Sequence, residues 1–236
     1  MIDYIDLFDE KLIYEEICES PIALRTNMAS VLSGKESISK NITKILFEPF
    51  IEKFYSQINL IQIHWDISPK SMENVDHFKN DPWIKENYLD KGYEWSFVHE
   101  MLSGFINIQK LEDILNPEFC KEQGYYYKLK WTDGINADDY LPFDICAGMT
   151  ACLKVENGKI PDNLWLVITE DVDDCLYDMK VTIEEYLNLA YQAKLFRHWQ
   201  AIYLWKNEYD RFELMKRFLP KIVPHVKLDL SSFGME

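Results

Sequence analysis

The chain has 236 residues, of which 47% are hydrophobic and 14% aromatic. This is enough apolar material to bury a substantial core, and it excludes a disordered or low-complexity chain. With 25 basic and 40 acidic residues the formal net charge is −15, and such a surface repels phosphate backbones and anionic lipids, which argues against direct binding to nucleic acid or membrane.

The N-terminal part of the sequence predicts helices. Apolar residues at roughly helical spacing within residues 2–17 indicate a short amphipathic helix in an N-terminal extension, residues 1–35. A second apolar stripe contains Pro49. Because proline breaks a helix interior but is tolerated in a first turn, we expect two helices here, over residues 38–47 and 49–58.

Residues 60–67 are expected to form the first strand of a sheet, since apolar and polar residues alternate along them. Trp65 falls on the core-facing side. His64 falls on the polar side, where a solvated imidazole is the default interpretation. The polar stretch that follows, residues 68–93, predicts an insertion or a loop carrying a short helix.

Consecutive strands are predicted next. We expect them at residues 104–108, 122–131, 140–155 and 163–171, with a helical turn after the first, an acidic loop after the second and a polar connection, residues 171–180, after the last. Asn157 and Gly158 favour a hairpin turn between the last two strands.

Two helices close the predicted domain. Thr182 followed by Glu185 has the pattern of a capping box at a helix start. A further helix over residues 197–219 precedes an irregular tail, residues 220–236. Helices, consecutive strands and helices again form an α+β layout. We therefore expect a single α+β domain over residues 36–219, a mostly antiparallel twisted sheet flanked by helices.

The cysteines and the N-terminal sequence predict a cytoplasmic protein. The five cysteines contain no C-x-x-C pair, and their odd number leaves one over in any full disulfide scheme, so reduced thiols are the simplest account. The first residues are acidic where a secretory signal is basic. No apolar run approaches the roughly 18–20 residues of a membrane-spanning helix.

Motifs that carry chemistry are absent from the sequence. It contains neither of the glycine-rich phosphate-binding patterns nor the G-x-S-x-G nucleophile pattern, and no two of its five histidines have the spacing of an H-E-x-x-H metal site. We therefore predict no catalytic residue, no metal site and no cofactor. A cysteine–histidine or serine–histidine site needs only proximity in the folded chain, and the sequence leaves it open.

Two acidic clusters remain. The first contains Asp133, Asp138 and Asp139, and the second contains Glu170, Asp171, Asp173 and Asp174. Neither has the glycine and glutamate that a calcium-binding loop requires. Three interpretations follow: solvated turn residues, a docking patch for a protein, or a metal or catalytic site.

In their order along the chain, these elements resemble the SUKH superfamily, which includes fungal cell-wall synthesis regulators and many bacterial immunity proteins. The resemblance spans about residues 38–205. The resemblance rests on the segments "GFINIQKLEDIL" and "YLPFDICAGMTACLKV", the closing helix with Trp199, and the residues Ile45, Leu46, Pro49, Phe54, Tyr55, Asn59 and Trp65. Leu60 departs from it, because the family often has glycine there, and residues 68–93 make this chain longer than a usual member.

The resemblance implies a non-catalytic protein-binding domain of SUKH-like fold, and in bacteria an immunity protein that binds and occludes a cognate toxin of nuclease or deaminase type. An acidic partner would be steered into the basic cleft of such a toxin. The expected docking residues are Asp133, Asp138, Asp139, Asp171, Asp173 and Asp174, with Tyr125, Tyr126 and Tyr127 as exposed aromatic anchors.

Two alternatives stay open. One is a regulatory or adaptor protein of the same fold without a toxin partner. The other is a metal-dependent hydrolase that uses the acidic loops. The net charge does not distinguish the immunity, adaptor and hydrolase functions, because a negative net charge can also simply keep a cytosolic protein soluble.

Overall fold

The structure is a computed structural model, and it describes residues 6–8, 11–12, 23–25, 30–33, 46–67, 72–146, 148–170, 175–205 and 210–223. By its contacts the chain divides into two compact units. Unit 1 comprises residues 1–5, 30–62 and 106–190, and unit 2 comprises residues 6–29, 63–105 and 191–236. Each unit is described by itself.

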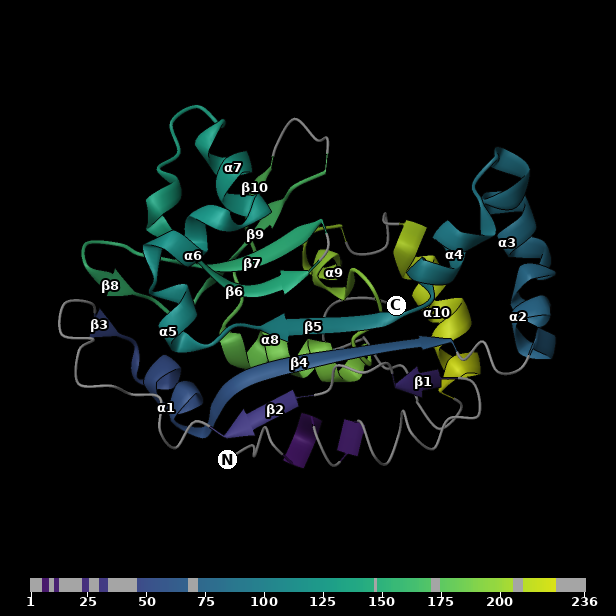
Figure 1. Cartoon of the computed structure of the whole chain (residues 1–236), viewed down its shortest axis with the longest axis horizontal. Coiled ribbons are helices and arrows are strands. Elements are labelled where there is room, and N and C mark those ends of the chain that lie inside the picture. Colours follow the sequence, from purple (N-terminus) through teal and green to yellow (C-terminus); the bar gives the residue numbers. More distant parts are fainter. Residues whose placement is uncertain are drawn as a thin grey trace. The chain divides into compact units, whose positions relative to one another are not determined.

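Unit 1 contains most of the sheet (Figure 1). Its elements are β2 (Ser30–Ser33), β3 (Leu46–Phe47), α1 (Pro49–Gln57), the first half of β4 (Ile58–Ile67), the end of β5 (Gly104–Ile108), α5 (Leu111–Ile114), α6 (Pro117–Glu122), α7 (Gly124–Lys130), the 3-10 helix η3 (Ala137–Asp139), β6 (Tyr140–Cys146), β7 (Met149–Lys154), β8 (Lys159–Ile160), β9 (Leu164–Ile168), β10 (Leu176–Asp178) and all but the last two residues of α8 (Ile183–Gln192).

The strands of unit 1 pair mostly antiparallel. β5, β6, β7, β9 and β10 follow one another in the sheet, and β2 runs antiparallel to β4. β3 and β8 form a separate parallel pair. The α+β class and the mostly antiparallel sheet with its helices are therefore confirmed.

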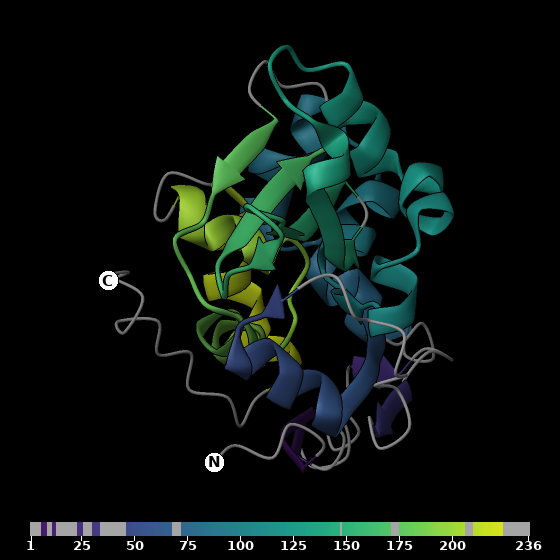
Figure 2. The ribbon, with the colours of Figure 1, turned by 90° about the vertical axis from the view of Figure 1, so that its left-hand side faces the viewer.

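Helices pack on both faces of the unit 1 sheet. On one face, Tyr125 and Leu129 of α7 join a buried cluster with Cys152 of β7 and Val167 of β9. In Figure 2 the teal helices α5 to α7 lie along one side of the green strands. The residues between these positions in β7 and β9 are buried as well, so the sheet contributes side chains to the core from both faces.

A register shift in β6 brings two neighbouring residues to the second face. The shift falls between Pro142 and Asp144, and such a bulge lets successive side chains point the same way. Phe143 and Asp144 both contact Tyr186 of α8, through a ring contact at 6.1 Å and a hydrogen bond of 2.7 Å. Phe143 also contacts Phe54 of α1. One bulge thus holds α1 and α8 on the sheet.

Unit 2 is mainly helical. Its elements are β1 (Ala23–Arg25), the second half of β4, α2 (Met72–Lys79), α3 (Pro82–Asn87), the 3-10 helix η2 (Leu89–Lys91), α4 (Trp95–Met101), the start of β5, the 3-10 helix η4 (Trp199–Ala201), α9 (Ile202–Trp205) and α10 (Asp210–Ile222). β1 pairs antiparallel with β4. Phe218 of α10 packs against Phe78 of α2 and Trp83 of α3.

Trp65 is the centre of the unit 2 core. Its side chain is fully buried, and its indole N–H donates to the carbonyl oxygen of Lys194 at 2.8 Å. A side chain at Gly104 would overlap the indole ring, so only glycine fits beside it. The core-facing position predicted for Trp65 is confirmed. His64, on the other side of the strand, is partly exposed and lies 3.4 Å from Asp66.

Several local predictions are confirmed. β4, β5, β6, β7 and β9 lie where strands were expected, and α1 begins at Pro49. Asn157 and Gly158 both have positive φ, at 52° and 75°, as a tight hairpin turn requires. At the start of α8 the backbone N–H of Thr182 donates to Glu185, and the backbone N–H of Glu185 donates to the Thr182 hydroxyl, which completes the capping box.

The strand predicted over residues 122–131 is wrong, because this segment forms α7. Its buried residues, Tyr125 and Leu129, are four apart, whereas Tyr127 between them is exposed. That is helical spacing. Aromatic residues favour strands only weakly, and burial of one helical face outweighs the preference here.

Other boundaries also differ. Residues 46–47, expected at the end of a helix, form β3, and the polar connection after β9 contains β10. Residues 68–93 contain more helix than one short segment, namely α2, α3 and η2. The helix expected over residues 197–219 is divided into η4, α9 and α10, and α10 continues through Pro220 to Ile222, so the predicted tail begins later.

Some predictions lie outside the described residues. These are most of the helix expected within residues 2–17, the earlier part of that expected over residues 38–47, and the tail beyond residue 223. The predicted domain boundaries stay a prediction.

Candidate functional site

The candidate site is the surface of unit 1 formed by α6, α7 and η3, residues 117–139, which we call the α7 surface. Asparagine side chains cap the N-termini of two of its helices. Asn116 accepts a hydrogen bond from the N–H of Glu118 at the start of α6, and Asn136 accepts one from Asp138 at the start of η3. Such caps satisfy backbone N–H groups that have no partner inside the helix. The caps therefore fix where these two short elements begin.

The three tyrosines of α7 have different environments. Tyr125 is buried, and its hydroxyl donates to the carbonyl oxygen of Tyr140 at 3.1 Å. Its predicted role as an exposed anchor is therefore wrong: at a helical period it faces the sheet. Tyr126 is half-buried and donates to Asp138 at 2.9 Å. Tyr127 is 54% exposed, as expected of an anchor.

Trp131, directly after α7, was not predicted as a site residue, yet it is 82% exposed. It follows Tyr127 by four residues, and positions four apart share one face of a helix. The two rings therefore extend from the same side of α7. A helical interpretation of the segment would have identified both residues from the sequence.

The acidic residues predicted for docking separate into two groups. Asp133 and Asp138 are exposed on the α7 surface, and Asp139, half-buried, accepts a hydrogen bond from the Asn136 side chain. The other three, Asp171, Asp173 and Asp174, lie outside the described residues. Lysines interrupt the negative charge, since Lys121, Lys128 and Lys130 belong to the same surface. This surface is thus of mixed charge around exposed aromatic rings.

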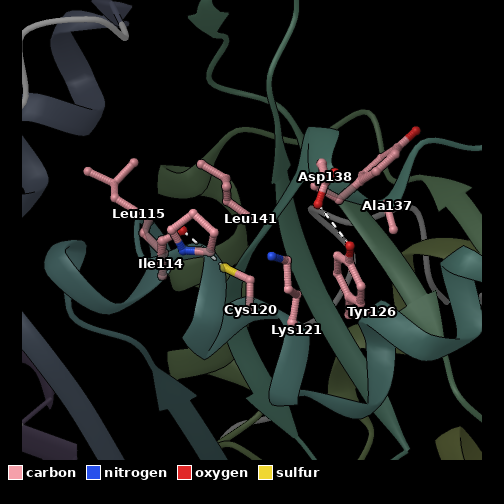
Figure 3. A pocket seen from close by; sticks show the side chains of 10 residues that line it. Ile114, Leu115, Cys120, Lys121, Tyr126, Ala137, Asp138 and Leu141 are labelled. Atoms are coloured by element: carbon pink, nitrogen blue, oxygen red, sulfur yellow. Dashed lines mark hydrogen bonds between the residues drawn. The ribbon is translucent and has the colours of Figure 1, made fainter.

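A pocket of about 260 Å³ opens beside α6 and η3 (Figure 3). Its apolar wall consists of Ile114, Leu115, Pro117, Ala137 and Leu141. The remaining lining residues are Cys120, Lys121, Tyr126, Asp138 and Tyr140. Figure 3 shows the thiol of Cys120 turned toward Ile114, and Tyr126 reaching the carboxylate of Asp138. The pocket therefore has an apolar wall and a polar rim.

The thiol in this pocket is not activated as a nucleophile. Burial raises the pKa of Cys120, and it raises the pKa of Cys152 in the same cluster well above the ordinary value. The Cys120 thiol donates to the carbonyl oxygen of Ile114 at 3.3 Å. Because the thiolate is the reactive form, these thiols are poorly reactive at neutral pH.

A metal site receives no support from the described residues, among which no group of three His, Cys, Asp or Glu side chains is placed to hold an ion. The fully buried carboxylate of Asp144 accepts hydrogen bonds from the backbone N–H of Asn107 at 2.8 Å and the hydroxyl of Tyr186 at 2.7 Å. It lies inside the core, where it connects β5, β6 and α8.

Comparison with known proteins gives no match to any family model, curated protein or solved structure. In the part of the chain that the structure describes, none of the helices combines the length and apolar character needed to cross a membrane.

Proposed function

We propose that this chain is a non-catalytic protein-binding domain whose docking face is the α7 surface. The observation that carries the proposal is the exposure of Tyr127 and Trp131 on one side of α7. Tryptophan and tyrosine dominate the binding energy of protein interfaces, because they bury a large area at little conformational cost. Asp133 and Asp138 lie on the same surface and would add polar contacts around the rings.

The partner we propose is a basic protein, and more specifically a toxin domain of nuclease or deaminase type that this chain neutralises by occlusion. The support is the net charge of −15 and the resemblance to SUKH immunity proteins. A nuclease grips phosphate groups with a basic cleft, and an acidic protein is attracted to the same cleft. A cytoplasmic location belongs to the proposal too, and its support is that Cys120, Cys146, Cys152 and Cys175 are free thiols, the form that cysteines usually have in a reducing compartment.

The first test is co-expression with a toxin-like protein encoded beside this gene. We expect rescue of growth, a stable complex of the two purified proteins, and an association rate that falls as salt concentration rises. Growth arrest despite co-expression would contradict the immunity role. A complex with a housekeeping assembly in place of a toxin would instead favour the regulatory or adaptor function.

The second test addresses the surface. Trp131→Ala should weaken the complex at least about tenfold, the loss typical of an aromatic hot spot. The matched control is Tyr93→Ala with Phe97→Ala, which removes two stacked aromatic residues that are also exposed but belong to unit 2. Equal loss of affinity in both variants, measured by isothermal titration calorimetry, would refute the α7 surface as the docking face.

A further inference from the structure

The pocket beside α6 and η3 shares Tyr126 and Asp138 with the α7 surface. A volume of about 260 Å³ accommodates one large side chain rather than a cofactor or a folded segment. Interface energy concentrates where a side chain of one protein fills a pocket of the other. The properties of the lining therefore select the side chain that fills the pocket.

The polar rim favours a cation. The Tyr126 hydroxyl donates to Oδ1 of Asp138 at 2.9 Å. Among the described residues, nothing donates to the second oxygen, Oδ2. A carboxylate accepts about four hydrogen bonds, so Asp138 retains capacity for further donors. The Tyr126 bond also fixes the orientation of the carboxylate at the mouth of the pocket.

Lys121 also lines the pocket, and its charge attracts Asp138 without a direct ion pair between the two, since its main partner is Glu118. Lys121 forms an ion pair with Glu118 of its own helix at 3.2 Å. The three charges of Glu118, Lys121 and Asp138 therefore sum to −1. An occupant with a positive head and an apolar stem matches both this charge and the wall formed by Leu115 and Leu141.

We propose that the pocket receives one arginine side chain of the partner protein, with its methylene stem against Leu115 and Leu141 and its guanidinium on Asp138. Arginine fits better than lysine, because its planar fork of donors engages a carboxylate through two parallel hydrogen bonds and its weaker hydration suits a partly apolar site. The inference rests on the protein-binding function proposed above, and it names the chemistry that the partner must present.

The decisive experiment is a titration of the isotope-labelled full chain with N-acetyl-arginine amide, followed by NMR. We expect saturable shifts at Cys120, Ala137 and Asp138, with a dissociation constant in the millimolar range, as is usual for so small a ligand. The matched control ligand is N-acetyl-citrulline amide, which has nearly the same shape without the charge, and it should bind at least several-fold more weakly.

Two variants test whether the side chain that binds in the pocket is positively charged. Asp138→Asn should abolish arginine binding, whereas Lys121→Met, which keeps the stem but removes a like charge, should preserve or strengthen it. Both residues are exposed, so the variants should fold, and their unfolding curves provide the check. Binding of N-acetyl-glutamate amide that depends on Lys121 would overturn the proposal, and so would the absence of saturable shifts with arginine.

A second readout uses the cysteine in the pocket. Alkylation of this slowly reacting thiol, followed over long exposure by peptide mass spectrometry, should become slower still with N-acetyl-arginine amide bound, and N-acetyl-citrulline amide should protect it less. The two proposals fail separately. If Trp131→Ala abolishes the complex but arginine does not bind, the docking face is supported and the arginine pocket is refuted. If arginine binds but no protein complex forms, the pocket is supported and the docking face is refuted.

Discussion

Asp144 illustrates how a charged residue is kept inside a core. Its carboxylate accepts hydrogen bonds from Asn107 and Tyr186, and the thiol of Cys146 lies 3.6 Å away. All three groups donate to the carboxylate, so both of its oxygens have partners. A hydrogen bond to a charged group contributes about 1.5–3 kcal/mol, and removal of a partner leaves a buried group unsatisfied.

We expect Asp144→Asn to lower the free energy of unfolding by about 2 kcal/mol or more, because an amide presents a donor where the neighbouring groups also donate. Urea titration followed by tryptophan fluorescence measures the change. Asp138→Asn, an identical replacement at an exposed position, is the control and should stay within about 0.5 kcal/mol of the original chain. Equal effects at the two sites would contradict the role assigned to Asp144.

The packing of Gly104 against Trp65 can be tested by adding a methyl group. Any Cβ there would overlap the buried Trp65 ring, so Gly104→Ala should cost about 1–3 kcal/mol or more through forced repacking. Gly124, in the first turn of α7, has open space around its Cβ position. Gly124→Ala should therefore be neutral or stabilise by up to about 1 kcal/mol. The thermal unfolding temperature should fall for Gly104→Ala and stay level or rise for Gly124→Ala, and a tolerated Gly104→Ala would show that Trp65 can move.

Between α3 and α10, the ion pair of Asp81 with Lys221, at 3.2 Å, predicts a pH dependence. Burial acts to raise the pKa of Asp81, but hydrogen bonds from Lys221 and the Trp83 N–H outweigh it, and the pKa is lowered overall. A carboxyl whose pKa is lower in the folded state stabilises at pH values above its unfolded pKa, about 3.9, and loses that contribution as pH falls through the folded value.

Asp81→Asn tests this element. Asparagine is also a good helix cap, so the replacement removes the charge and keeps the cap of α3. We expect a loss of at most about 1 kcal/mol at neutral pH, since Lys221 is well exposed. The difference between the variants should shrink as pH falls below about 4. A difference that persists at pH 2 would assign the effect to something other than ionisation.

The helices and strands show which sequence signals are strong. The alternation around Trp65 predicted β4 correctly, because a period of two residues is specific to strands. The Thr182–Glu185 box predicted the start of α8 correctly, because a capping box marks the first turn of a helix. The tyrosine run of α7 was misread, because its period becomes clear only when the burial of Tyr125 and Leu129 is known. Since Trp131 belongs to that helix face, the error in the element also concealed the most exposed aromatic residue of the site.

Across the whole molecule, composition predicted a packed core, and the order of the expected helices and strands predicted the α+β class. The absence of a long apolar run predicted that no described helix is long and apolar enough to cross a membrane. The pocket could not be predicted, because its lining comes from α5, α6, α7, η3 and β6, and only the fold brings these together. The likeness to SUKH proteins and the binding role stay predictions. They depend on a partner, whose identity is not encoded in the core-forming residues that carry the resemblance.

The interleaving of the two units restricts how the molecule can be dissected. Each unit is assembled from three separate stretches of chain, and β4 and β5 each contribute to both. No single cut, by a protease or by a shortened gene, can release either half as a continuous fragment. The larger fragment made by any single cut would therefore contain parts of both units.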